Sequence, residues 1–171
     1  MKEINLKEFK NLDEDTQIEY ATDLEYEDNA IFKWGLFCDI LKDSSISDLT
    51  RIEILNILGA SDIPKDESRQ FINTILNSLE NREEDSTYLS HCIMALQNND
   101  LFSLNVYSKM LEFFLNSNED EDLRTNASII IDNNTPKDEL IEYYKSFIKK
   151  KDSLFGERST EWIKEIQERS H

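Results

Sequence analysis

Residues 48–59 read DLTRIEILNILG, and this stretch decides the fold of the 171-residue chain. Its aliphatic residues recur every three or four positions, the spacing that places apolar side chains along one face of an α-helix. The same spacing recurs in residues 72–79, 89–96 and 107–114, and no six-residue window alternates cleanly between apolar and polar residues. We therefore predict an all-α chain of about ten helices.

Capping and turn residues set the expected helix bounds. Residues 16–19 read TQIE, the pattern of a capping box at a helix start, and Gly59 suits the residue that follows a helix end. Short connections favour antiparallel neighbours. The expected helices cover approximately residues 3–10, 15–27, 29–43, 47–59, 64–80, 85–98, 103–117, 121–133, 137–151 and 157–169.

A two-helix repeat is visible in the second helix of each expected pair. The stretch 48–59 is matched by residues 86–96 and 121–131, which places Arg51, Leu89 and Arg124 at equivalent positions, 38 and 35 residues apart. A single helical pair cannot bury its apolar face alone, so pairs of this kind stack. We expect one domain over residues 1–171, made of five antiparallel hairpins at 1–27, 28–60, 61–99, 100–134 and 135–171.

Two of these repeats resemble HEAT repeats. In one, residues 41–43 (LKD) lead into residues 48–51 (DLTR); in the other, residues 115–117 (LNS) lead into residues 122–124 (DLR). The resemblance implies a right-handed α-solenoid, an Asp–Arg ladder between successive hairpins, and binding of other proteins along the curved faces. The 61–99 repeat departs from the pattern because Leu89 stands in place of the arginine. The Trp, Leu-Gly and Tyr pattern of tetratricopeptide repeats is absent.

Charge and composition exclude several classes of function. The chain has 19 Lys and Arg against 36 Asp and Glu, a formal net charge of −17, which opposes binding to nucleic acid and to anionic membranes. Its three glycines cannot form a Rossmann fingerprint or a P-loop. It has no window of about 18 apolar residues and no signal-peptide pattern. Cys38 and Cys92 lie among apolar residues and are expected to be buried free thiols. We expect a cytoplasmic protein.

Candidate chemistry is sparse. His91 and Cys92 diverge by about 100° on a helix, so they do not form a dyad. Residues 168–171 (ERSH) form a single ExxH motif, whereas a di-iron bundle needs two. Residues 118–122 (NEDED) lack the glycine and the distal glutamate of an EF-hand loop. We expect no catalytic residue, no metal site and no cofactor, and therefore not an enzyme.

Acidic residues cluster in the turns that lead into the second helix of each expected pair. The helix dipole favours one or two carboxylates at such a position, but runs of three or four repel one another. The excess charge is confined to residues 1–142, which sum to −19, while residues 143–171 sum to +2. We expect these clusters to form an acidic ridge for a partner: Asp13, Glu14, Asp15, Glu83, Glu84, Asp85, Glu119, Asp120, Glu121 and Asp122.

These properties predict a protein-binding module whose partner has a basic surface. Electrostatic steering accelerates encounters of this kind. The most concrete class is an immunity protein that neutralises a basic, nuclease-like bacterial toxin. The alternative is a scaffold or adaptor that binds its partner through the concave face of the solenoid. The residues expected on that face are Glu53, Asn56, Ser90, His91, Met94 and Asn126.

Overall fold

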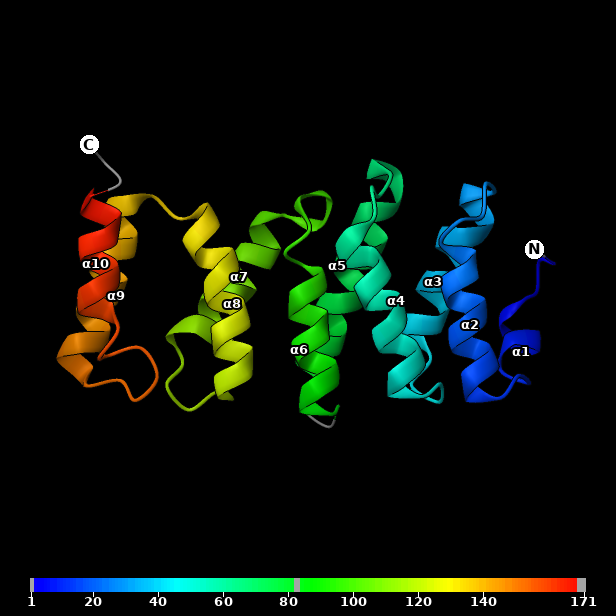
Figure 1. Ribbon diagram of the computed structural model, residues 1–171, viewed down its shortest axis with the longest axis horizontal. Helices are drawn as coiled ribbons and strands as arrows, with labels where there is room; N and C mark the ends of the chain where they lie inside the picture. Colours follow the sequence, from blue (N-terminus) through cyan, green and yellow to red (C-terminus); the bar gives the residue numbers. More distant parts are fainter. Residues whose placement is uncertain (1, 82–83, 169–171) are drawn as a thin grey trace. The chain divides into compact units, whose positions relative to one another are not determined.

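The computed structural model describes residues 2–81 and 84–168, which form helices and no strand (Figure 1). The predicted all-α class and the number of helices are confirmed within these residues. The helices are α1 (Leu6–Phe9), α2 (Glu14–Leu24), α3 (Ala30–Lys42), α4 (Asp48–Ala60), α5 (Lys65–Glu80), α6 (Ser86–Ala95), α7 (Leu104–Leu115), α8 (Glu121–Asn134), α9 (Lys137–Lys150) and α10 (Ser159–Glu168), with a 3-10 turn, η1 (Asn99–Leu101), before α7.

The start of α2 differs from the predicted capping box at Thr16. The N-cap lies three residues earlier, at Asp13, which accepts a hydrogen bond from the Thr16 backbone N–H at 3.1 Å. The Thr16 hydroxyl also donates to the Asp13 carboxylate, at 2.8 Å. An aspartate caps a helix at least as well as a threonine, so the earlier residue sets the start.

The end of α4 also differs from prediction, because Gly59 lies inside the helix with an ordinary negative φ. The exposed carbonyls at this end are satisfied by side chains instead of a left-handed glycine. Asn98 Nδ2 donates to the carbonyls of Leu58 and Ser61 at 2.7 and 2.8 Å, and Ser61 Oγ donates to the Ile57 carbonyl at 2.8 Å. A residue 37 to 40 positions away therefore terminates this helix.

The chain divides into two compact units, Met1–Val106 and Tyr107–His171, with the boundary inside α7. The single domain over residues 1–171 stays a prediction. In the first unit α4 packs against both α2 and α6, and α3 packs against α5. Trp34 joins α3 to α5 by edge-to-face contacts with Phe37 and Phe71, both at 6.0 Å between ring centroids. Cys38 and Cys92 are buried free thiols in this core, as predicted.

The core of the second unit is an aromatic cluster. Phe147 of α9 lies 5.0 Å from Phe114 and 5.2 Å from Phe155, measured between ring centroids, and Tyr144 lies 5.1 Å from Trp162 of α10. The three phenylalanines are at most 3% exposed. Helices α9 and α10 therefore share one apolar interior.

A buried ion pair crosses this cluster. Arg124, 1% exposed, donates from Nη1 and Nη2 to the two carboxylate oxygens of Asp152 at 3.2 and 2.8 Å. Burial alone would raise the pKa of Asp152, but the bonds from Arg124 and from the backbone N–H groups of Phe155 and Leu154 outweigh it and lower the pKa. The carboxylate thus stays charged and holds both the arginine and the turn after α9.

Arg51 of the first unit has the same arrangement. It is 3% exposed and donates to Glu84, 33 residues ahead, at 2.8 Å from Nη2, while also pairing with Asp48 on its own helix. Its guanidinium lies 4.0 Å above the Tyr88 ring, as that of Arg124 lies 4.7 Å from Phe155. Both arginines therefore bind a carboxylate in a turn further along the chain and stack on an aromatic ring.

Candidate functional site

The candidate site of the first unit is the edge at which α2, α4 and α6 begin, at the bottom of Figure 1. Side-chain contacts hold the successive turns of this edge together. Gln17 accepts a hydrogen bond from Thr50 at 3.3 Å, which joins the first turns of α2 and α4. The Arg51–Glu84 pair joins α4 to the turn before α6. These two contacts join the turn before α6 and the first turns of α2 and α4 within this unit.

The turns at the ends of α1 and α3 meet at the same edge. Lys10 Nζ lies 2.6 Å from Asp43 Oδ2. The pKa of Asp43 is lowered to about 2, mainly by this bond from Lys10 and to a smaller extent by the hydrogen bonds from Ser45. Asp43 therefore remains a carboxylate at any physiological pH, with its charge partly balanced by Lys10.

Two of the predicted ridge residues cap helices. Asp13 caps α2, and Asp85 caps α6 by accepting from the Thr87 backbone N–H at 2.8 Å. The side-chain bond from Thr16 lowers the pKa of Asp13, and the backbone bond from Thr87 lowers that of Asp85. Both residues are exposed, so they stabilise helix starts while keeping a negative charge at the surface.

The other predicted residues of this unit differ in their surroundings. Glu14 and Asp15 are exposed in the first turn of α2. Glu84 is engaged by Arg51, and its side chain is only 12% exposed. Glu83 lies outside the described residues. The exposed charge at this edge therefore comes mainly from the start of α2 and from the caps.

The third acidic cluster belongs to the second unit. Asp120 caps α8, accepting from the backbone N–H groups of Asp122 and Leu123 at 2.9 and 3.3 Å, and its own N–H donates to Glu119 at 3.3 Å. Glu121 and Asp122 are exposed in the first turn of α8. This cluster repeats the arrangement at α2: one capping aspartate followed by two exposed carboxylates.

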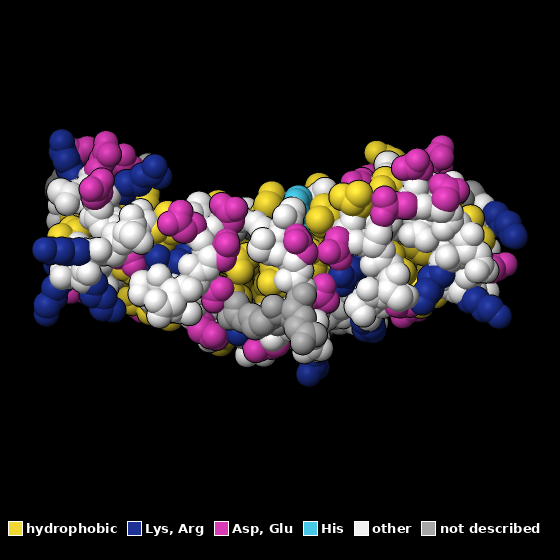
Figure 2. All heavy atoms as spheres, turned by 90° about the horizontal axis from the view of Figure 1, so that it is seen from below, with side chains coloured by type: hydrophobic (Ala, Val, Ile, Leu, Met, Phe, Trp, Pro, Cys, Tyr) yellow, Lys and Arg dark blue, Asp and Glu magenta, His cyan; other side chains and the backbone are white. Residues whose placement is uncertain are grey.

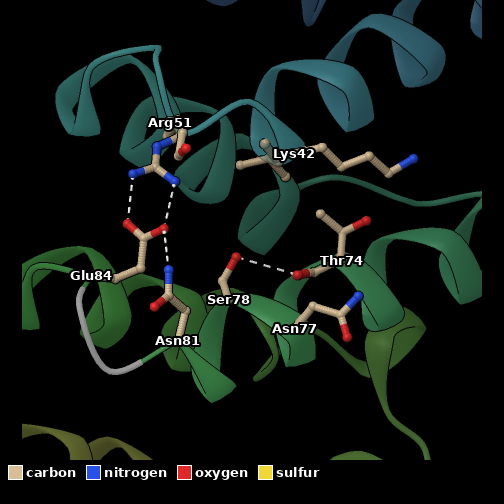
Figure 3. A pocket seen from close by; sticks show the side chains of 9 residues that line it. Lys42, Arg51, Thr74, Asn77, Ser78, Asn81 and Glu84 are labelled. Carbon is tan, nitrogen blue, oxygen red and sulfur yellow. Dashed lines mark hydrogen bonds and ion pairs between the residues drawn. The ribbon is translucent and has the colours of Figure 1, made fainter.

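Figure 2 looks at the molecule from below and shows carboxylates interspersed with neutral and a few basic side chains. A hollow of about 360 Å³ opens beside the Arg51–Glu84 pair (Figure 3). Asn81 Nδ2 donates to Glu84 at 3.4 Å on its wall, and Ser78 Oγ donates to the Thr74 carbonyl at 3.3 Å. The lining residues are Leu41, Lys42, Ser44, Arg51, Thr74, Asn77, Ser78, Asn81 and Glu84.

The hollow was not predicted, because its polar residues resemble any solvated helix face. Asn77, Ser78 and Asn81 lie on or just after the last turn of α5, and their sequence carries no periodic signal. One sequence feature pointed to this part of the molecule: the alignment of Arg51 with Arg124. Hydroxyl and amide groups beside an ion pair suit hydrogen bonding to a polar side chain.

The residues expected on the alternative face come together in part. His91 Nδ1 and Asn56 Oδ1 are 3.0 Å apart and link α6 to α4, and Thr22 donates to Glu53 at 3.3 Å, which links α2 to α4. Met94 is 43% exposed. Ser90 lies on α6 beside His91, and Asn126 lies on α8 in the second unit.

Burial raises the pKa of the Cys92 thiol to about 12, so it stays protonated and is a poor nucleophile. No group of three or more His, Cys, Asp or Glu able to hold a metal ion occurs in residues 2–81 and 84–168. No helix there has the length and apolarity needed to cross a bilayer.

Comparison with protein-family models, with curated proteins and with solved structures gives no match. The candidate site therefore rests on the geometry described above.

Proposed function

We propose that the chain is a HEAT-like helical-repeat protein that binds a basic protein partner through its acidic turns. The forward-reaching Arg51–Glu84 and Arg124–Asp152 pairs support the repeat assignment, because both join equivalent positions to a following turn. A solenoid built of antiparallel hairpins would carry such pairs as a ladder.

The observation that carries the proposal is the chemistry of the edge at the starts of α2, α4 and α6. Exposed carboxylates stand there on Asp13, Glu14, Asp15 and Asp85. Helices α3 and α5 end at this same edge (Figure 1), so the negative ends of their dipoles oppose the positive ends of α2, α4 and α6. The exposed carboxylates therefore set the sign of the edge, and they complement a basic surface.

Within that class we propose an immunity protein that neutralises a basic, nuclease-like toxin. A basic nuclease must present cations to the phosphates of its substrate, and an acidic surface of matching size would occupy the same cations. An immunity protein bound in this way would exclude the nucleic-acid substrate from the toxin by occupying its binding surface, and it would need no catalytic activity of its own.

We expect that a gene beside that of this chain encodes a basic nuclease domain, and the test is the association of that domain with this chain. The edge variant combines Glu14→Gln and Asp15→Asn at the edge of the first unit with Glu121→Gln and Asp122→Asn in the acidic turn of the second unit, all at exposed positions in first helical turns. We expect its association rate constant at low salt to fall at least about tenfold, because steering depends on net complementary charge. Stopped-flow fluorescence measures the rate constant.

A control variant removes the same number of negative charges elsewhere: Asp23→Asn, Asp62→Asn, Asp66→Asn and Asp138→Asn, all exposed. We expect it to associate nearly as fast as the natural chain. Equal slowing in the two variants would show that only the bulk charge matters. An unchanged rate in the edge variant would refute the acidic-turn surface, and a neighbouring gene without a basic toxin domain would refute the immunity assignment.

A scaffold or adaptor that binds through the α4–α6 face is the second proposal. It is favoured by the exposed Met94 near the His91–Asn56 contact, because an exposed methionine with adaptable polar neighbours suits a protein interface. Met94→Glu would then abolish binding, whereas the edge variant would bind normally.

A further inference from the structure

A second hollow, of about 300 Å³, lies within the second unit between α8, α9 and α10. Its volume is at the lower end of the range for ligand pockets, and it suits one long side chain. The apolar and aromatic residues of its lining are Leu140, Tyr144, Trp162 and Ile166. The remaining lining residues are Asp132, Asn133, Thr135, Lys137 and Glu165.

The aromatic wall is held rigidly. Tyr144 is 2% exposed, and its ring lies 5.1 Å from that of Trp162, at an interplanar angle of 50°. Trp162 also lies 6.0 Å from Phe155, measured between ring centroids, so the indole contacts two rings and remains partly exposed. An indole that is fixed by its neighbours and partly exposed is a good platform for a cation.

The carboxylate at the hollow is fixed as well. Tyr144 donates its hydroxyl proton to Asp132 Oδ1 at 2.6 Å. Burial, followed by the bond to Asp132, raises the pKa of Tyr144, so the phenol remains a donor at physiological pH. Asp132 and Glu165 outnumber the one cation of the lining, Lys137, so the formal charge of the hollow is negative.

We propose that this hollow binds the guanidinium group of an arginine side chain presented by a protein partner. A planar guanidinium stacks on an indole and bonds a carboxylate with two parallel N–H groups, whereas an ammonium group does neither. Trp162 provides the stacking face and Asp132 the carboxylate, while Leu140 and Ile166 contact the methylene groups of the arginine. This inference does not depend on the acidic turns, because none of those residues lines the hollow.

The experiment uses the full chain, labelled with ¹⁵N, and the blocked amino acid N-acetyl-arginine amide as the probe. The chain has two tryptophans, so its spectrum contains two indole N–H signals, which Trp162→Phe assigns. We expect the Trp162 signal to shift saturably with a dissociation constant in the millimolar range. Trp34, 4% exposed in the core of the first unit, is the internal control and should not shift.

Two comparisons separate recognition from general attraction. N-acetyl-lysine amide should bind at least about threefold more weakly, because it lacks the planar fork. Asp132→Asn should weaken binding of the arginine probe about tenfold, the loss expected for one charge-assisted hydrogen bond. Asp138→Asn removes an exposed charge of the same unit outside the hollow and should leave binding unchanged.

Three results would overturn the proposal: no shift of the Trp162 signal, equal affinity for the two probes, or equal binding by Asp132→Asn and the natural chain. Far-UV circular dichroism of each variant confirms that it is folded. The two proposals can fail separately. If the chain binds the arginine probe but the edge variant associates with the basic partner as fast as the natural chain, the arginine site is supported and the acidic-turn surface is refuted.

Discussion

Asp152→Asn is the sharpest perturbation of this fold, because Asp152 is the one carboxylate that pairs with Arg124 among residues 2–81 and 84–168. The guanidinium is 1% exposed, and its other hydrogen bond is a 3.3 Å contact from Nη2 to the Phe114 carbonyl. Among the described residues its Nε has no hydrogen-bond partner. The amide of asparagine keeps the shape of Asp152 and an oxygen that can still cap the turn, so the variant removes mainly the charge.

The expected cost is about 3–5 kcal/mol, the range found when one partner of a buried ion pair is removed. That is a large share of the roughly 5–15 kcal/mol that stabilises a typical domain. For a chain of this length each kcal/mol lowers the melting temperature by about 2–4 °C. We therefore expect a decrease of about 6–20 °C.

Thermal and urea unfolding, followed by far-UV circular dichroism, measure the loss. The control is the double variant Arg124→Met, Asp152→Asn, which removes both charges. It should be more stable than Asp152→Asn alone, because a buried cation without a counterion costs more than its replacement by an apolar side chain. A loss below about 1 kcal/mol in the single variant, or a double variant less stable than the single, would refute this account of the pair.

The same pair determines part of the pH dependence of stability. The pKa of Asp152 is lowered in the folded chain, while an unfolded aspartate has a pKa of about 3.9. Its contribution is therefore complete above about pH 4 and is lost as the pH falls through the folded-state pKa. The stability difference between the natural chain and Asp152→Asn should accordingly shrink below about pH 4.

Two further substitutions test the neighbouring structure. Glu84→Gln should cost less than Asp152→Asn, about 1–3 kcal/mol by urea unfolding, because Arg51 keeps its pair with Asp48; an equal or greater cost would contradict this. Gly156→Ala should destabilise the chain by about 1–3 kcal/mol, because a Cβ there would lie 2.5 Å from the Asp152 carbonyl oxygen, and a neutral result in the same assay would show that the turn relaxes freely.

The helical content was predictable because it follows from the spacing of apolar residues along the chain. The stripes within residues 72–79 and 89–96 follow the 3.6-residue period, and both became parts of buried helices. The internal similarity aligned Arg51 with Arg124, and both are buried. Local periodicity and internal similarity carry this information, so no knowledge of long-range contacts was needed.

Helix ends and partners were less predictable. Gly59 is a residue type that often follows a helix end, but the hydrogen bonds at the end of α4 come from Asn98. Asn98 lies 40 residues from Leu58, so local sequence does not indicate this contact. The first expected helix, residues 3–10, shrank to Leu6–Phe9, since a single turn has little to stabilise it. Glu84 and Asp152 lie in irregular turns, which have no periodic pattern. The sequence therefore does not indicate that these two carboxylates pair with the buried arginines.

The forward direction of the two arginine pairs has a consequence for synthesis of the chain. Arg51 is translated 33 residues before Glu84, and Arg124 is translated 28 residues before Asp152. At roughly 5–20 residues per second, each arginine waits about 1–7 seconds for the carboxylate of the following turn. During that interval Arg51 has Asp48 on its own helix as a counterion, whereas burial of Arg124 is balanced only once Asp152 has been translated. The packing around each arginine is therefore completed with a delay of 28 to 33 residues in the nascent protein.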